Sequence, residues 1–386
     1  MNSTKIWNIY HNTYILRNYV GTLIRKERNI FTTPSSYFNS SERLYNFGFQ
    51  KVTENIKSKL IHNLFSNVSN KYDIMNDLMS LGIHRIWKTQ LVNELDLYLK
   101  YHSQNLHEEV YKNEILIKEQ EVIDTSHKYD EKVLNEEKEQ INSIDNEQYE
   151  TNEEDICLTM EQKNNLNNSN NKILDLAGGT GDIAFRIIEK YIYFLKIYKT
   201  NNTYCYIDDI IYKKYEQYIP RLIVCDINKD MMEVGKKRAI ELDYNKYIMW
   251  LNDSAENLKS IKTNSIDIVT LSFGIRNFTD ISKALKEIYR VLKPGGRFLC
   301  LEFCKPTYEI VKPAYTFYLN QCIPILGMIV ANSKDSYKYL AESIQTFLTP
   351  EELARLMFEH KFINVTYTTM TFDVVAIHSG YKLSST

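Results

Sequence analysis

The stretch that decides the fold is residues 172–182, KILDLAGGTGD, an apolar run that ends in a glycine-rich loop and leads into a helical pattern. A strand, a loop and a helix in this order form the cradle in which parallel α/β sheets hold a nucleotide-like ligand. Glycines let the backbone approach such a ligand without a clash from a Cβ atom. We therefore expect Asp175, Gly179, Thr180 and Gly181 to bind a cofactor.

The loop lacks one glycine of the dinucleotide pattern G-x-G-x-x-G, because Ala184 occupies the third glycine position. In that pattern the pyrophosphate sits on the N-terminus of the following helix, so its absence argues against a nicotinamide-dependent oxidoreductase. S-Adenosylmethionine has no phosphate and does not require the third glycine. The loop favours this cofactor.

Two later strand ends carry polar residues that suit the same ligand. Asp226 follows the apolar run 222–225, where a carboxylate can accept hydrogen bonds from both ribose hydroxyls. Ser254 and Ala255 follow the third strand and are expected beside the adenine, with Asp253 as a rival for the polar contact there. The distance from the loop to Asp226 is about twice the usual ~20 residues. We explain the excess by a second insertion, residues 190–220, rich in Tyr, Lys and Asn.

From residue 172 onward, strand-like and helical patterns alternate, which is typical of a parallel sheet covered on both faces. The tail differs, since two strand-like runs at 362–369 and 372–379 are joined by a very short connection and predict an antiparallel hairpin. The predicted strands are residues 172–177, 221–227, 247–251, 266–273 and 297–303 with these two, and the predicted helices are residues 183–195, 230–242 and 281–292.

The remaining segments divide by composition. Residues 1–43 are basic, poor in acids and amphipathic at their start, which predicts a mitochondrial transit peptide; an ordinary disordered terminus is the alternative. The pattern from Leu44 to about Leu99 is helical, and we expect residues 44–100 to form an N-terminal helical cap. Residues 101–171 form an acidic, low-complexity insertion, and residues 172–386 the cofactor-binding domain.

Charge and cysteine content exclude several functions. The net charge is only -2, so we expect no nucleic-acid partner. The insertion holds 18 acidic against 6 basic residues, which leaves the rest of the chain basic and suited to anionic lipid. The six cysteines form no C-x-x-C pair, and we expect no metal site. No apolar run reaches the 18 residues that a membrane span requires.

With these landmarks in place, the chain resembles the ubiquinone/menaquinone biosynthesis C-methyltransferase family over roughly residues 67–90 and 172–382. The stretches that carry the resemblance are 71–77 (KYDIMND), 82–85 (GIHR), 175–182 (DLAGGTGD), 226–228 (DIN), 272–277 (SFGIRN), 289–296 (YRVLKPGG), 301–303 (LEF), 335–344 (DSYKYLAESI) and 380–382 (GYK).

The resemblance implies a class I Rossmann-like methyltransferase fold: α/β, with a seven-stranded, mostly parallel sheet, an antiparallel C-terminal hairpin and an N-terminal helical cap. It implies methylation of a ring carbon of a polyprenylated methoxy-benzoquinol, in the mitochondrial matrix at the inner membrane, as a peripheral protein within a ubiquinone-biosynthesis complex and with a possible homodimer. It also places Thr180, Asp226, Ser254, Ala255 and Ser272 at the cofactor.

Methyl transfer to a ring carbon requires a nearby group that stabilises the ring oxyanion. Arg276 and Asn277 follow the fourth strand, where α/β sheets bind ligands, and can donate hydrogen bonds to that oxygen. The base is a water or a neighbouring group. Tyr72 lies on the cap, and His84 is the nearest residue that titrates close to neutral pH, although a purely structural role for His84 is the more frequent case.

The apolar stretch Tyr315–Ile329, with Met75, Leu78, Met79 and Phe273, suits a path for an isoprenoid tail, but such spacing is also typical of simple core. Two other functions stay open: the same chemistry on a demethylmenaquinol, and a non-catalytic subunit of a quinone-synthesis complex. The latter predicts a damaged cofactor loop or the loss of the 276–277 pair, and the sequence has both intact.

Overall fold

The computed structural model of the chain describes residues 43–96, 98–99, 172–200, 203–206, 219, 222–331 and 334–384. Apart from Arg43, the predicted transit peptide lies outside these residues, as do the acidic insertion 101–171 and residues 201–202, 207–218 and 220 of the second insertion. The described residues fall into two compact units. The first holds residues 43–95, 172–189 and 222–384, and the second holds residues 96, 98–99, 190–200, 203–206 and 219.

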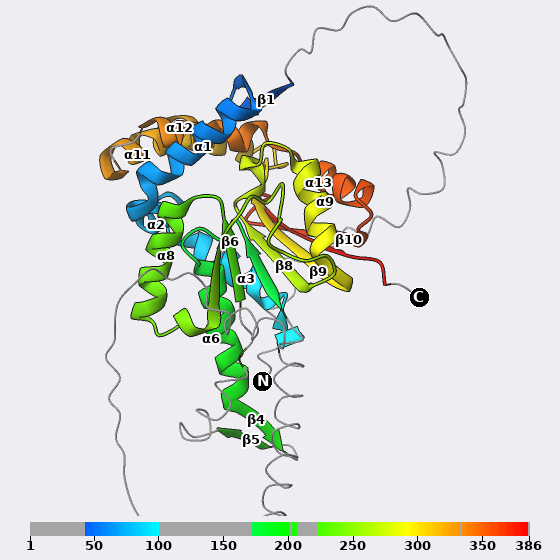
Figure 1. Ribbon diagram of the computed structural model, residues 1–386. Helices are drawn as coiled ribbons and strands as arrows, with labels where there is room; N and C mark the ends of the chain where they lie inside the picture. Colours follow the sequence, from blue (N-terminus) through cyan, green and yellow to red (C-terminus); the bar gives the residue numbers. More distant parts are fainter. Residues whose placement is uncertain are drawn as a thin grey trace, which may run out of the picture. The chain divides into compact units, whose positions relative to one another are not determined.

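A seven-stranded sheet forms the centre of the first unit, in the order β10-β11-β9-β8-β3-β6-β7 (Figure 1). The strands are β3 (Ile173–Leu176), β6 (Leu222–Asp226), β7 (Ile248–Asn252), β8 (Ile266–Ser272), β9 (Leu292–Phe303), β10 (Ile363–Met370) and β11 (Val375–Tyr381). Neighbours from β7 to β9 pair in parallel, whereas β11 pairs antiparallel with both β9 and β10. The predicted seven-stranded sheet with an antiparallel C-terminal hairpin is confirmed.

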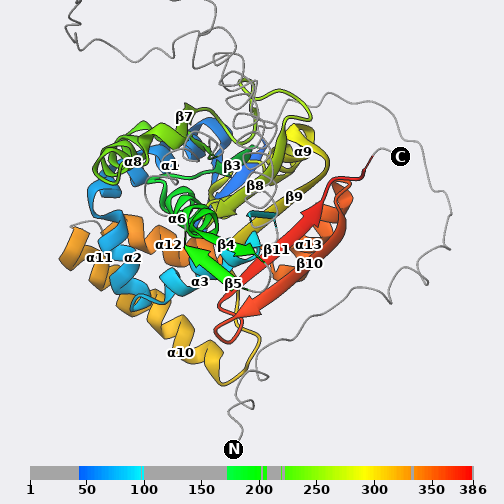
Figure 2. The same cartoon turned by 90° about the horizontal axis from the view of Figure 1, so that it is seen from below.

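Helices lie on both sides of this sheet. Figure 2 shows α3, α6 and α8 on one side and α9 and α13 on the other. Their bounds are α3 (Ile83–Asn93), α6 (Asp182–Lys196), α8 (Lys229–Glu241), α9 (Ile281–Val291) and α13 (Pro350–Glu359). Local chemistry fixes their starts: Thr349 and Glu352 form a capping box at α13, and the Asn228 side chain accepts a hydrogen bond from Met231 N at α8.

The main core lies between the sheet and the helices α9 and α13. Its fully buried members come mainly from β3, β6, β8 and β9 and from α9 and α13, and include Leu174, Val269, Leu271, Ile288, Phe298, Met357 and, just before β10, Phe362. β3 and β6 are buried on both faces, which explains why their sequences read as continuous apolar runs.

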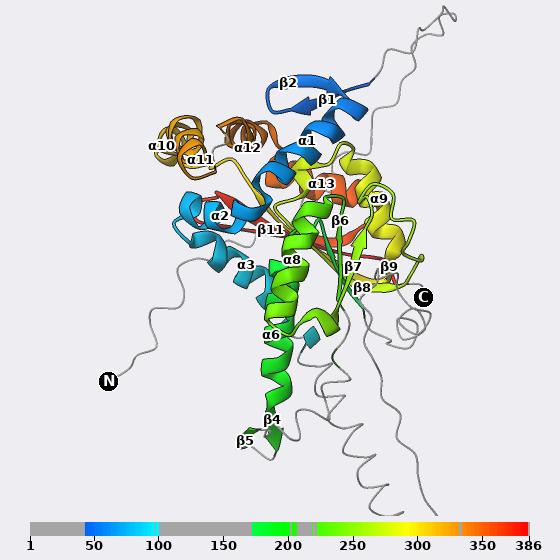
Figure 3. The ribbon, with the colours of Figure 1, turned by 60° about the vertical axis from the view of Figure 1, so that its left-hand side comes forward.

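The cap is built from two segments that are far apart in the sequence (Figure 3). Its N-terminal half holds α1 (Glu54–Val68), η1 (Ser69–Lys71), α2 (Tyr72–Ser80) and α3. Its C-terminal half holds α10 (Val311–Phe317), the π turn η4 (Tyr318–Cys322), α11 (Ile323–Ala331) and α12 (Lys334–Thr346). Val68 and Met75 of the first half pack with Leu319, Ile323 and Ile344 of the second in one apolar cluster. The sequence predicted only the N-terminal half.

The helical prediction for the start of the cap is wrong, because residues Leu44–Thr53 form a hairpin of β1 (Leu44–Phe47) and β2 (Gln50–Thr53). Gly48 opens the two-residue loop with a φ of +57°, the position that glycine prefers in type II′ hairpin turns. The Phe47 ring stacks on Tyr339 at 4.4 Å between centroids, which holds the strand against the rest of the cap.

In the second unit, the C-terminal part of α6 leads into a short antiparallel hairpin, β4 (Ile197–Thr200) and β5 (Thr203–Tyr206). Two 3-10 turns, η2 (Asn245–Tyr247) and η3 (Ile275–Asn277), complete the described elements. Within the described ranges, no helix combines the length and the apolar character that crossing a bilayer requires.

Candidate active site

A first cavity of about 290 Å³ lies at the carboxyl ends of the parallel strands. Its walls come from the glycine-rich loop, the ends of β6, β7 and β8, and one face of α1. Of the residues predicted to bind the cofactor, Asp175, Gly179, Thr180, Asp226, Ser254, Ala255 and Ser272 line it. The structure therefore brings seven of the eight together.

Gly181 is the eighth, and it is not among the residues that line the cavity. A Cβ atom at this position would lie 2.9 Å from the Trp250 ring and 3.1 Å from that of Phe185, and its φ is +78°. Gly181 thus allows close packing behind the loop. Gly178 is the tighter position on the loop itself, because a Cβ there would lie 2.7 Å from Val224 and 2.8 Å from the Asp175 carboxylate.

Asp226, at the end of β6, is hydrogen-bonded to the glycine-rich loop. Its Oδ2 accepts a hydrogen bond from Gly179 N at 2.9 Å, and its Oδ1 accepts one from Asn228 N at 2.8 Å. Burial raises the pKa of Asp226, while these backbone donors oppose the rise. Each oxygen keeps a second lone pair, so the carboxylate can still accept the hydroxyls of a ribose.

Two buried polar atoms of the cavity lining have no hydrogen-bond partner among the described residues: Oδ2 of Asp175 and Oγ of Ser272. The other oxygen of Asp175 accepts from Thr270 Oγ1 at 3.0 Å, and burial raises the pKa of this carboxyl to about 7. Unpaired buried polar atoms cost free energy unless a ligand completes them. These two atoms fit a polar ligand such as S-adenosylmethionine.

The end of the cavity at which we predicted the adenine is formed by residues 253–256. The Asp253 carboxylate accepts hydrogen bonds from Ser254 N at 2.9 Å and Ser260 N at 3.1 Å. The rival predicted for this contact therefore has both oxygens engaged in shaping the turn. Ser254 Oγ accepts from Glu256 N at 3.3 Å and keeps its own proton to donate.

The position of α1 at this cavity was not predicted from the sequence, yet Asn55, Ser58 and His62 line it. Their spacing of three and four residues places them on one face of the helix, and this was the available signal. Asn228 fastens the helix there, because its Nδ2 donates to His62 O at 3.0 Å and to Ser66 Oγ at 3.1 Å.

A second cavity, of about 260 Å³, adjoins the first and is lined mainly by apolar and aromatic side chains from both halves of the cap. Phe65, Tyr72, Lys88 and Phe273 line both cavities and so form the boundary between them. Phe273 has a φ of +57°, an uncommon conformation for a bulky residue that is typical of functional sites.

Arg276 and Asn277 lie on different sides of this boundary. Arg276 is buried and lines the second cavity; its Nη1 donates to Glu302 Oε1 at 2.8 Å and to Phe273 O at 2.5 Å. Asn277 lines the first cavity, and its Oδ1 accepts from the Tyr339 hydroxyl at 3.1 Å. Glu302 is wholly buried and also accepts from Arg276 N at 3.3 Å.

His84 lines the second cavity, but its ring nitrogens face polar groups of the cap. Nδ1 shares a hydrogen bond of 2.7 Å with Ser80 Oγ, and Nε2 lies 3.8 Å from Asp77 Oδ1. Burial, reinforced by the Lys88 charge, lowers the pKa of His84 to about 4. The imidazole is therefore neutral at pH 7.

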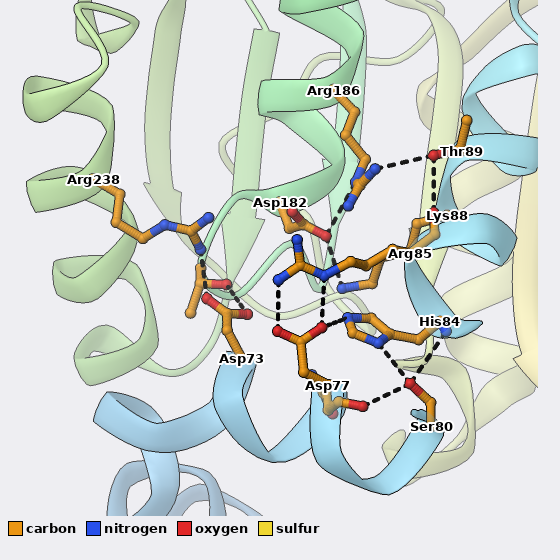
Figure 4. A network of polar contacts seen from close by, with 12 residues as sticks. Asp73, Asp77, Ser80, His84, Arg85, Lys88, Thr89, Asp182, Arg186 and Arg238 are labelled. Carbon is orange, nitrogen blue, oxygen red and sulfur yellow. Dashed lines mark hydrogen bonds and ion pairs between the residues drawn. The ribbon is translucent and has the colours of Figure 1, made fainter. Parts of the chain in front are cut away.

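A polar network fastens the N-terminal half of the cap to the cofactor loop (Figure 4). Asp73 Oδ2 accepts from Arg238 Nη1 at 2.5 Å, and Asp73 Oδ1 accepts from Thr180 Oγ1 at 3.4 Å. Lys88 Nζ lies 2.9 Å from Asp182 Oδ2, at the start of α6. Among the described residues, no group of His, Cys, Asp and Glu is arranged to hold a metal ion.

The strand order, the glycine-rich loop and the acid at the end of the next strand define a class I, S-adenosylmethionine-dependent methyltransferase. Residues 52–104 and 130–382 match the model of the ubiE/COQ5 methyltransferase family. The chain belongs to this family.

Curated relatives align with this chain over most of their length. The chain is 34% identical to the protein named 2-methoxy-6-polyprenyl-1,4-benzoquinol methylase, mitochondrial, of Xenopus laevis, over 90% of this chain and 93% of that one. The proteins of the same name from Arabidopsis thaliana and Homo sapiens are each 35% identical to it. The Arabidopsis match covers 94% of this chain and 97% of that protein, and the human match covers 87% of this chain and 84% of that protein.

Proposed function

We propose that the chain methylates a ring carbon of a 2-methoxy-6-polyprenyl-1,4-benzoquinol, with S-adenosylmethionine as methyl donor, in the synthesis of ubiquinone. The observation that carries the proposal is the pair of adjoining cavities: one at the strand ends, whose lining includes the unpaired polar atoms of Asp175 and Ser272, and a mainly apolar one beneath the cap, with four shared side chains between them. The relatives' names support the substrate.

S-Adenosylmethionine, when bound, supplies a methyl group on a sulfonium sulfur for in-line transfer to a carbon nucleophile. Asp226, Ser254, Ala255 and the loop residues Gly179 and Thr180 would hold it in the first cavity, where Asp175 and Ser272 offer unpaired polar atoms. The protein's main task is then to hold the quinol ring in an attack geometry.

The quinol carbon becomes nucleophilic when a ring hydroxyl loses its proton, so a donor must stabilise the resulting oxyanion. Arg276 suits this role because it stays protonated and is held rigidly by Glu302 and Phe273 O. Asn277 accepts from Tyr339 through Oδ1 and can donate through Nδ2. Tyr72 would help to position the ring at the boundary of the two cavities.

The proton acceptor is proposed to be a water in the second cavity or His84. A histidine whose pKa is lowered to about 4 is neutral and can accept a proton, but it is a weak base. Its contacts with Ser80 and Asp77 equally support a structural role in the cap.

We also propose that residues 1–43 direct the chain into mitochondria, where it binds the matrix face of the inner membrane peripherally. The relatives are named mitochondrial. Around the second cavity the cap exposes large apolar side chains: Leu81, which also lines that cavity, is 84% exposed, Ile310 92%, Phe317 63% and Ile329 70%. Membership of a ubiquinone-biosynthesis complex and homodimer formation belong to the same proposal and rest on the family resemblance.

The activity is tested with purified protein, S-adenosylmethionine and two acceptors: a reduced 2-methoxy-6-polyprenyl-1,4-benzoquinone and a demethylmenaquinol. We expect a benzoquinol product that is one methyl group heavier. Preferential methylation of the naphthoquinol, or none of either, would overturn the proposal.

Flotation with anionic vesicles tests the membrane surface. Exchange of Phe317 and Ile329 for Ser should weaken binding to the vesicles and leave methylation of a short-tailed quinol unchanged.

A further inference from the structure

The second cavity contains two buried donors without a partner among the described residues. They are Nε of Arg276 and the hydroxyl of Tyr315, and both residues line the cavity. Arg276 comes from η3, which follows β8, and Tyr315 from α10 in the C-terminal half of the cap, so the fold brings them to one cavity from elements far apart in the sequence.

Two other tyrosine hydroxyls close to this site are engaged. The Tyr318 hydroxyl, one turn further along the same helical segment, donates to Met79 O and links the two halves of the cap. The Tyr339 hydroxyl donates to Asn277 Oδ1. Tyr315 differs because its hydroxyl is buried against a mainly apolar wall and has no hydrogen-bond partner in the described part of the chain. A buried hydroxyl in this state carries an unfavourable desolvation cost that a polar group of a ligand would remove.

We infer that Tyr315 is a catalytic residue that donates a hydrogen bond to an oxygen substituent of the aromatic substrate, next to Arg276 as a second donor. This assignment rests on the proposed function, since it takes a hydroquinone-type ring as the ligand of the second cavity. The substrate oxygen would then be bound by Tyr315 from the C-terminal half of the cap as well as by Arg276, which follows β8 of the sheet.

The chemistry of the phenol determines its role. Burial raises the pKa of Tyr315, so the group keeps its proton and acts as a donor, not as the base. A neutral donor in a cavity with little water stabilises negative charge on a substrate oxygen more strongly than it would in bulk solvent. Because α10 is part of the cap, the hydrogen bond from Tyr315 to the substrate forms only when the cap covers the sheet.

The test compares Tyr315→Phe with Tyr367→Phe in the full-length enzyme. Both exchanges remove one phenolic hydroxyl; that of Tyr367 donates to Glu351 at 2.8 Å and lies away from both cavities. We expect Tyr315→Phe to lower kcat/KM for a short-tailed methoxy-hydroquinone by about 10- to 100-fold, a range typical of the loss of one hydrogen bond to a charged oxygen. The Kd for S-adenosylmethionine, measured by calorimetry, should change by less than about twofold in the same variant.

Tyr367→Phe should lower the melting temperature and keep kcat/KM. A Tyr315→Phe enzyme whose kcat/KM stays within threefold of the wild type would overturn the assignment of Tyr315 and leave the proposed function intact. A wild-type enzyme that methylates no hydroquinone would instead overturn the proposed function. The two failures are therefore distinguishable.

Discussion

Lys88 on the cap and Asp182 at the start of α6 form an ion pair, 2.9 Å from Nζ to Oδ2, with only 8% and 20% of their side chains exposed. Lys88 also lines both cavities, and Asp182 follows directly on the cofactor loop. Burial alone would raise the pKa of Asp182, but the charges of Lys88 and Arg186 outweigh it and lower the pKa to about 2. This pair ties the cap to the cofactor site.

Exchange of Lys88 for Met should therefore destabilise both the fold and the cofactor site. We expect the free energy of unfolding to fall by about 2–3 kcal/mol, somewhat below the usual cost of breaking a buried pair, because Arg186 still contacts Asp182 at 3.3 Å. Urea unfolding of Lys88→Met, Asp182→Asn and the double variant measures the coupling. If the single effects simply add within about 0.5 kcal/mol, the pair does not couple the two elements.

Asp226 should be required for cofactor binding more than for stability. Asp226→Asn replaces a carboxylate that accepts two backbone hydrogen bonds at the cavity wall, and we expect the Kd for S-adenosylmethionine to rise by about 10- to 100-fold, as for a lost charge-assisted hydrogen bond. Calorimetry provides the measurement. Asp243→Asn is the matched control, because Asp243 is 84% exposed and pairs with Lys246 on the surface. Equal affinities in the two variants would contradict the role of Asp226.

The pH dependence of stability should reflect a histidine that is buried in its neutral form. His378 is 1% exposed, its Nε2 lies 3.0 Å from Pro350 O, and burial lowers its pKa to about 4 from 6.5. Since the unfolded chain takes up the proton first, stability is lost as the pH falls from 6.5 towards 4.

In His378→Gln this loss should be smaller by about 2 kcal/mol between pH 7 and pH 5, whatever the variant's stability at pH 7. Denaturant unfolding at the two pH values gives the difference. An unchanged loss would show that His378 is already charged in the folded protein.

How far the sequence predicts the fold depends on whether the signal is local. The apolar runs of β3 and β6 are buried on both faces and bounded by turn residues, so pattern alone located them. The β1–β2 hairpin was missed because its strands are only four residues long and its one strong signal is Gly48. A helix is the more frequent interpretation of a short amphipathic stretch that leads into α1.

The same limit applies to the site. Loop and strand-end residues such as Gly179 and Asp226 were predictable because the carboxyl ends of parallel strands meet at one edge. The donor role of Tyr315 was not predictable, since the sequence suggested only a path for the isoprenoid tail along 315–329. The position of its hydroxyl depends on how the two halves of the cap pack, for example Met75 against Ile323. Gly181 has the residue type that a cofactor loop requires, but its neighbour in space is Trp250, which only the tertiary structure reveals.

The guanidinium of Arg276 should be irreplaceable by another cation. Its Nη1 is bound to Glu302 and Phe273 O while Nε is left for a ligand, an arrangement that needs a planar group with several donors. Lysine offers one compact ammonium, which would stay with the buried Glu302 carboxylate. We therefore expect Arg276→Lys to lower kcat by about 100-fold or more, as for the loss of an oxyanion donor.

The matched control is Arg290→Lys. Arg290 pairs with Glu287 outside both cavities, so its exchange should affect only stability. Steady-state methylation assays of both variants, normalised to folded protein, decide the matter: comparable kcat values would exclude Arg276 from oxyanion stabilisation.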